Sequence, residues 1–151
     1  MYLVTFYDAI AMTKRYAFVP EVFSELNRLS KSELRKYILD YYKKNLKGLE
    51  VINVDTGITI HFSMTSGRKT AMGEAMYQRK AEIIRILPDL VRYALYNNFG
   101  NPKESDSPDI IGYLNFKGRC VIDGKTENVR IAVQFQKQAK FYYNIEVNTI
   151  K

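Results

Sequence analysis

The chain has 151 residues, enough for one domain that buries a sizeable core without disulfide or metal support. Apolar residues make up 46% of it, which excludes a disordered chain. The net charge of +7 comes from 23 basic and 16 acidic residues and favours polyanionic partners, mainly nucleic acid. The single cysteine, Cys120, excludes a disulfide framework and a zinc site within one chain, so we expect a cytoplasmic setting and no cofactor.

The first third of the sequence predicts helices. Residues 1–19 are aromatic and apolar without a clear period, which indicates a short strand or an ordered arm, and they lack the basic start of a signal peptide. A proline and apolar residues at helical spacing predict a helix over 20–29. Residues 30–33, Ser-Lys-Ser-Glu, have the spacing of a capping box, so a second helix is predicted over 30–46.

Two short strands are predicted next. Residues 49–54 and 58–64 alternate between apolar and polar side chains around Asp-Thr-Gly at 55–57, which is a hairpin turn signal. The apolar side chains of the second strand form its inward face. His61 and Ser63 therefore point the other way, towards solvent or a cleft.

The middle of the chain predicts a loop and two helices. The loop covers 65–70 and precedes a helix over 71–87. A proline cannot donate the backbone bond of a continuous helix, so a separate short helix is predicted over 88–96. Residues 97–102, rich in Asn and Gly, end that helix. Residues 103–109 are polar and form the loop that we expect to be mobile.

Three strands are predicted to close the chain, over 110–122, 129–136 and 140–147. The predicted fold class is α+β, with N-terminal helices packed on a twisted antiparallel β-sheet. Residues 1–48 would be a helical extension and 49–151 the main domain, together in one compact unit. No apolar run approaches the roughly 18 residues of a membrane span, so no membrane contact is expected.

Several side chains are candidates for chemistry. His61 is the only histidine, so it is either a proton-transfer group or an ordinary surface residue. Residues 66–70 contain Arg68 and Lys69 before a predicted helix N-terminus. Backbone N–H groups, the helix dipole and the two cations would together hold a phosphate. The alternative is an ordinary polar connection.

Lys80 falls within an apolar stripe at helical spacing, beside Arg79. A lysine there either extends along the apolar surface to reach solvent or faces a cleft, where it would stabilise charge on phosphoryl oxygens. Gln134 lies on the polar side of a predicted strand. That side would hydrogen-bond and stack on bases, or it is simply a solvated sheet face.

A family resemblance adds to this reading of the residues. From residue 49 to the end, the sequence resembles the large polyvalent protein-associated domains of phages and mobile elements, of the barnase/EndoU/colicin/RelE-like nuclease fold. The matching positions are Asp55-Thr56-Gly57-Ile58, Phe62-Ser63, Gly67-Arg68-Lys69-Thr70, Lys80, Leu87-Pro88-Asp89-Leu90, Ala94, Asp123-Gly124-Lys125 and Tyr142-Tyr143-Asn144. The resemblance implies a metal-independent RNase, often a toxin, with Ser63, Lys69, Lys80 and Tyr143 as functional residues.

The sequence therefore predicts a metal-independent, toxin-type endoribonuclease that acts on RNA, with a cognate inhibitor or a host protein as a further partner. His61 would transfer the proton, the cations would hold the phosphate, and Gln134 and Tyr143 would position the RNA. The alternation places no carboxylate on the candidate face, so a barnase-like Glu/His pair is not expected. The alternative function is a catalytically inactive module that grips a host protein or nucleic acid.

Overall fold

The computed structural model describes residues 19–23, 29–63, 81–138 and 140–150, with side chains up to Tyr142. The arm predicted over 1–19 lies almost wholly outside these residues, as do the loop over 65–70 and most of the helix over 71–87. The elements in chain order are α2 (Lys31–Tyr41), a π-helical segment (Tyr42–Leu46), β1 (Glu50–Ile52), β2 (Thr59–His61), a 3-10 turn (Ile84–Ile86), α5 (Leu87–Tyr93), β3 (Leu95–Gly100), β4 (Ile110–Ile122), β5 (Lys125–Gln136) and β6 (Lys140–Ile150).

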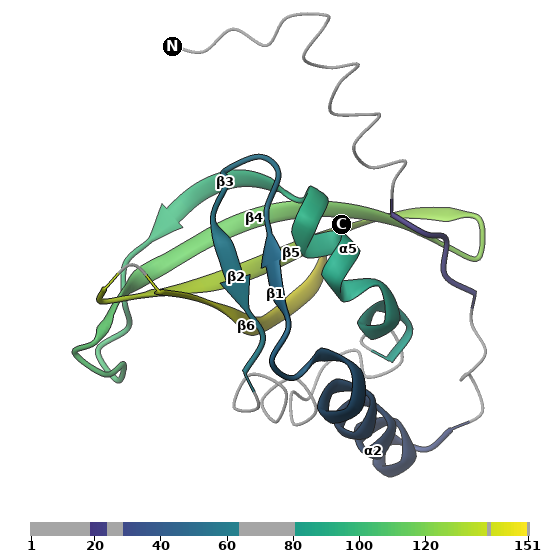
Figure 1. Ribbon diagram of the computed structural model, residues 1–151. Helices are drawn as coiled ribbons and strands as arrows, with labels where there is room; N and C mark the ends of the chain where they lie inside the picture. Colours follow the sequence, from purple (N-terminus) through teal and green to yellow (C-terminus); the bar gives the residue numbers. More distant parts are fainter. Residues whose placement is uncertain (1–18, 24–28, 64–80, 139, 151) are drawn as a thin grey trace, which may run out of the picture.

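Within the described residues, the strands form one six-stranded sheet in the order β1-β2-β6-β5-β4-β3 (Figure 1). Neighbouring strands run antiparallel except β2 and β6, which run parallel. The α+β class is confirmed, and the sheet is mixed, so the prediction of a wholly antiparallel sheet was wrong at this pair. Side-chain alternation is the same in both directions, so it fixes the faces of a strand but not the direction of its neighbour.

Helix α2 begins where the capping box predicts. The side-chain oxygen of Ser30 accepts a hydrogen bond from the Glu33 N–H, and the Glu33 carboxylate accepts one from the Ser30 N–H, both at 3.2 Å. The π-helical segment continues the helix to Leu46. Gly48, with a φ of 84°, then turns the chain in a conformation that favours glycine. The predicted helix over 30–46 is therefore confirmed.

The start of the helix predicted over 20–29 is wrong. Val22 is extended and forms a parallel bridge with Ile122 at the end of β4. Its N–H donates to the carbonyl of Val121 at 2.8 Å, and its carbonyl accepts from the N–H of Asp123 at 2.9 Å. A β-branched valine suits extended backbone, and the partner strand lies about a hundred residues away, beyond the reach of a local pattern. Residues 24–28 lie outside the described residues.

The short helix predicted over 88–96 is present as α5, but it begins one residue earlier, at Leu87, and ends at Tyr93. Residues 95–100, expected as a helix end and a loop, form the strand β3 along the edge of the sheet. Asn and Gly are depleted in strands, so the composition indicated a turn. The long strand β4 supplies the hydrogen-bonding partner, and a register shift between Tyr96 and Asn98 accommodates the irregular sequence.

Helices α2 and α5 and one face of the sheet contribute residues to a single buried core. Its members include Leu34 and Ile38 of α2, Leu87, Leu90 and Val91 of α5, and Val51, Ile60, Phe116, Cys120, Val129, Ile131 and Val133 of the strands. At Gly118 of β4, an added Cβ would lie 3.3 Å from Cδ2 of Leu90. Cys120 is buried as expected of a small filler. In the described part of the chain, no helix is long and apolar enough to cross a membrane.

Candidate functional site

The face of the sheet opposite the core, called the polar face, carries one row of polar side chains across five strands. The pairing register brings Glu50 opposite His61, His61 opposite Tyr142, Tyr142 opposite Gln134, and Gln134 opposite Tyr113. We call these five residues the polar row. Because directly paired residues share a face, strands distant in sequence bring these side chains together.

Of the predicted catalytic residues, only His61 lies within the described part of the chain. It lies between two other titratable side chains, Glu50 and Tyr142. Its Nδ1 atom lies 3.4 Å from a carboxylate oxygen of Glu50, and its ring centroid lies 5.6 Å from that of Tyr142. The side chain of His61 is 37% exposed. A carboxylate beside Nδ1 favours a proton on that nitrogen and leaves Nε2 to accept one. The geometry suits a general base.

Glu50 was missed in the sequence, and the prediction that no carboxylate shares the face of His61 was wrong. The alternating pattern alone gave the face of each strand but not the pairing between them. The signal that locates Glu50 is hairpin register: Ile52 pairs with Thr59 across the turn, and two further steps outward bring Glu50 opposite His61. Glu50 is itself 64% exposed, at the edge of the sheet.

The family described as large polyvalent protein-associated domain 3 matches residues 30–143. The chain belongs to this family. Domains of this type occur in the polyvalent proteins of phages and mobile elements. No curated protein and no solved structure matches the chain. The matched region of this polyvalent protein-associated domain takes in α2, the hairpin with Glu50 and His61, β4, β5 and the start of β6, and so includes every residue of the polar row.

Three more of the predicted site residues lie within the described part of the domain. Gln134 lies in the polar row, where its side-chain oxygen accepts a hydrogen bond of 2.6 Å from Gln136. Ser63 follows β2 and is half-buried. Tyr143 pairs with Val133, one position along from the row, and its side chain lies outside the described ones. Tyr142, which belongs to the matching positions of the resemblance but was not predicted as a site residue, occupies the position beside His61.

The remaining predicted residues lie outside the part of the domain that the structure describes. They are Arg68, Lys69, Arg79 and Lys80, all within residues 64–80. The structure thus brings together His61 and Gln134. Convergence of these two with the four cations stays a prediction.

Other cations of the polyvalent protein-associated domain lie on the polar face. Lys117 pairs directly with Arg130 across β4 and β5. The neighbouring pair is Arg119 with Asn128, and the Arg119 Nε donates to the Asn128 side chain at 3.2 Å. These basic residues alternate with buried core residues, so their charges gather on one face. That arrangement gives a local positive surface suited to a polyanion.

Proposed function

We propose that this domain is a metal-independent, toxin-type endoribonuclease of phage or mobile-element polyvalent proteins. The observation that carries the proposal is the Glu50–His61 pair beside Tyr142, with 3.4 Å between the carboxylate and Nδ1. A histidine oriented by a carboxylate is a recurrent proton-transfer device in enzymes. The basic polar face supplies the attraction for an RNA chain.

The proposed reaction is an internal transfer at the RNA backbone. Nε2 of His61 takes the proton from a ribose 2′-hydroxyl, and the 2′-oxygen then attacks the adjacent phosphorus. The new 2′-O–P bond forms as the P–O5′ bond breaks, giving a 2′,3′-cyclic phosphate and a 5′-oxygen that takes a proton from water. Glu50 holds the Nδ1 proton in place and stabilises the imidazolium that forms.

Binding and charge stabilisation fall to other residues in this proposal. Lys69, Lys80 and Arg79 would hold the phosphate, because cations stabilise the charge that builds on phosphoryl oxygens. Arg68 and Ser63 would contact the RNA backbone beside them. Gln134, Tyr142 and Tyr143 would position the RNA, since amides hydrogen-bond base edges and tyrosine rings stack on bases.

The test is cleavage of a labelled single-stranded RNA by the purified domain, with and without a chelator. We expect products that end in a 2′,3′-cyclic phosphate, at the same rate in both conditions. Abolition by the chelator would contradict metal independence. Intact RNA in both conditions would contradict the nuclease function.

A second candidate function is a catalytically inactive module that grips nucleic acid or a host protein. The placement of the described cations favours it. Arg130 lies four residues along β5 from Gln134, so Arg130 and its partner Lys117 are outside the row that contains His61. RNA binding without cleavage would support this function. A cognate inhibitor would then have no catalytic site to block.

A further inference from the structure

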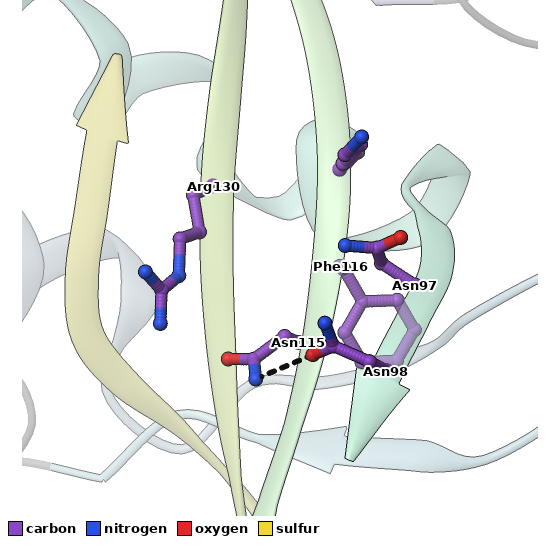
Figure 2. A pocket seen from close by; sticks show the side chains of 6 residues that line it. Asn97, Asn98, Asn115, Phe116 and Arg130 are labelled. Carbon is purple, nitrogen blue, oxygen red and sulfur yellow. Dashed lines mark hydrogen bonds between the residues drawn. The ribbon is translucent and has the colours of Figure 1, made fainter. Parts of the chain in front are cut away.

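Two adjacent hollows lie on the polar face, next to the edge strand β3. The first, of about 230 Å³, is lined by Asn97, Asn98, Asn115, Phe116, Lys117 and Arg130. Figure 2 shows its side chains, with Arg130 on β5 across from the asparagines. The second, of about 140 Å³, is lined by Gly100, Asn101, Lys103, Tyr113, Asn115, Arg130 and Ala132. Asn115 and Arg130 line both, so the hollows are neighbours.

Small residues on the polar face form the second hollow, and a register shift in β3 shapes the first. Ala132 pairs with Asn115, and Gly100 pairs with Tyr113, so short or absent side chains stand among long ones. Ala132 is only 2% exposed, because the longer neighbours stand over it. The register shift after Tyr96 in β3 brings consecutive asparagines to the rim of the first hollow. The sequence thus builds two depressions into a sheet face.

The first hollow presents matched hydrogen-bonding groups. Nδ2 of Asn115 donates to Oδ1 of Asn98 at 2.9 Å, and Figure 2 marks this bond. The bond orients both amides and leaves Oδ1 of Asn115 as an acceptor and Nδ2 of Asn98 as a donor. A nucleobase edge presents a donor beside an acceptor, so it is the complementary ligand.

The second hollow presents an oriented aromatic ring. The hydroxyl of Tyr113 donates to the carboxylate of Asp106 at 2.7 Å, and the Lys103 N–H donates to the same carboxylate at 2.8 Å. Nζ of Lys103 lies 6.0 Å from the ring centroid of Tyr113. An oriented tyrosine ring with a cation at its face suits a stacked base next to a phosphate.

We propose that the two hollows hold successive nucleotides of a single-stranded RNA, with Arg130 on the phosphate between them. Arg130 lines both hollows, and a guanidinium binds phosphate through paired hydrogen bonds. Lys117 adds a second cation at the first hollow. This inference rests on the proposed function for the identity of the ligand, RNA, but not for cleavage.

The experiment measures binding of a fluorescently labelled single-stranded RNA decamer by anisotropy, at low and moderate salt. We expect Arg130→Ala to bind about tenfold more weakly and to reduce the salt slope by about 1. Asn115→Ala should bind about tenfold more weakly with an unchanged slope, because it removes no charge. Ala132→Leu should also weaken binding, since Ala132 lines the second hollow and a larger side chain there takes up its space while every charge is kept. Lys43→Ala, which removes an exposed cation elsewhere, is the control, and thermal melting checks folding.

The outcomes separate this inference from the nuclease function. Wild-type binding that survives in the Arg130 and Asn115 variants overturns the inference, and RNA cleavage by the same preparations would leave the nuclease function standing. Binding that falls in the three variants supports the inference even if the wild type never cleaves RNA. A folded wild type that does not bind the decamer at low salt overturns the inference, and the cleavage assay decides the nuclease function separately.

Discussion

The side-chain amide of Asn53 donates a hydrogen bond of 2.9 Å to the carbonyl of Ala94, the residue that joins α5 to β3. The same amide donates to the carbonyl of Val91 at 2.8 Å. Its oxygen accepts from both the N–H and the hydroxyl of Thr56. This fully buried side chain ties the β1–β2 turn to the end of α5, and so fixes the hairpin that carries the candidate acid–base pair.

Asn53→Ala should therefore lower the free energy of unfolding by about 3 kcal/mol or more, because each buried carbonyl left without its donor costs about 1–3 kcal/mol. Urea denaturation measures the change. Asn45→Ala is the matched control: Asn45 is exposed, and its amide donates only to the carbonyl of Tyr41 within its own helix, at 3.2 Å. Equal denaturation midpoints for the two variants would contradict this role of Asn53.

Lys80→Ala should abolish RNA cleavage while the domain stays folded. Removing one donor that stabilises the transition state typically costs ~10²-fold or more in rate. A lysine that only packs its aliphatic stem would cost about 1 kcal/mol or less of stability and no activity. Thermal melting and cleavage are measured on the same preparation, with Lys43→Ala as the surface control. Cleavage at the wild-type rate would remove Lys80 from the site.

His61→Ala should reduce cleavage by ~10²-fold or more, the usual contribution of a general acid–base group. Glu50→Gln should cause a smaller loss, because Glu50 acts through His61. The double variant should then be no slower than His61→Ala alone, since the two residues act as one unit. Glu104→Gln, at an exposed carboxylate, is the control. Additive losses in the double variant would show that Glu50 acts independently.

Gly112→Ala should destabilise the edge of the sheet. An added Cβ would lie against the ring of Phe99 and 2.5 Å from the carbonyl oxygen of Gly100, so β3 must move away from β4. Forced overpacking of this kind costs about 1–3 kcal/mol, measurable by thermal melting. Gly100→Ala, on the paired strand, serves for comparison because its nearest new contact is 3.5 Å, to Asn115. A Tm drop no larger than that of Gly100→Ala would count against this packing.

The capping box should make helix stability depend on acidic pH. The Ser30 side chain and backbone hydrogen bonds lower the pKa of Glu33 below its ordinary value. The folded state therefore binds this proton more weakly than the unfolded state. The stabilisation is present at pH values above the ordinary pKa of a glutamate, and it is lost as the pH falls through the lowered pKa of Glu33. The Tm gap between wild type and Glu33→Gln should be largest at neutral pH and close in acid; a constant gap would contradict the linkage.

Local patterns predicted the elements whose signals are local. The capping box at Ser30 and a short helix with Pro88 in its first turn both appear where the sequence indicates them. Strand β3 and the extended Val22 were missed, because each depends on a partner strand rather than on its own composition. Tertiary pairing overrides propensity in such segments.

The candidate site was likewise predictable only in the residues that a local strand pattern reveals. The sequence indicated His61 and Gln134 as residues of polar strand faces, and both lie in the polar row. Glu50 and Tyr142 complete the surroundings of His61, but only the register of the strands places them there. The second hollow depends on small residues opposite long ones across strands, and the first on the register shift in β3. No single strand pattern contains these relations.

The position of β6 has a consequence for the time at which the site forms. β6 lies between β2 and β5, and Ile60 pairs with Phe141, so the strands of the first hairpin pair with the rest of the sheet through the last strand. Contacts between such distant residues form late, because a long loop must first be closed. Before β6 is made, no strand pairing joins the hairpin with His61 to the strand with Gln134. The polar row is assembled only after β6 has left the ribosome, so the growing chain carries both halves of the row but not the whole.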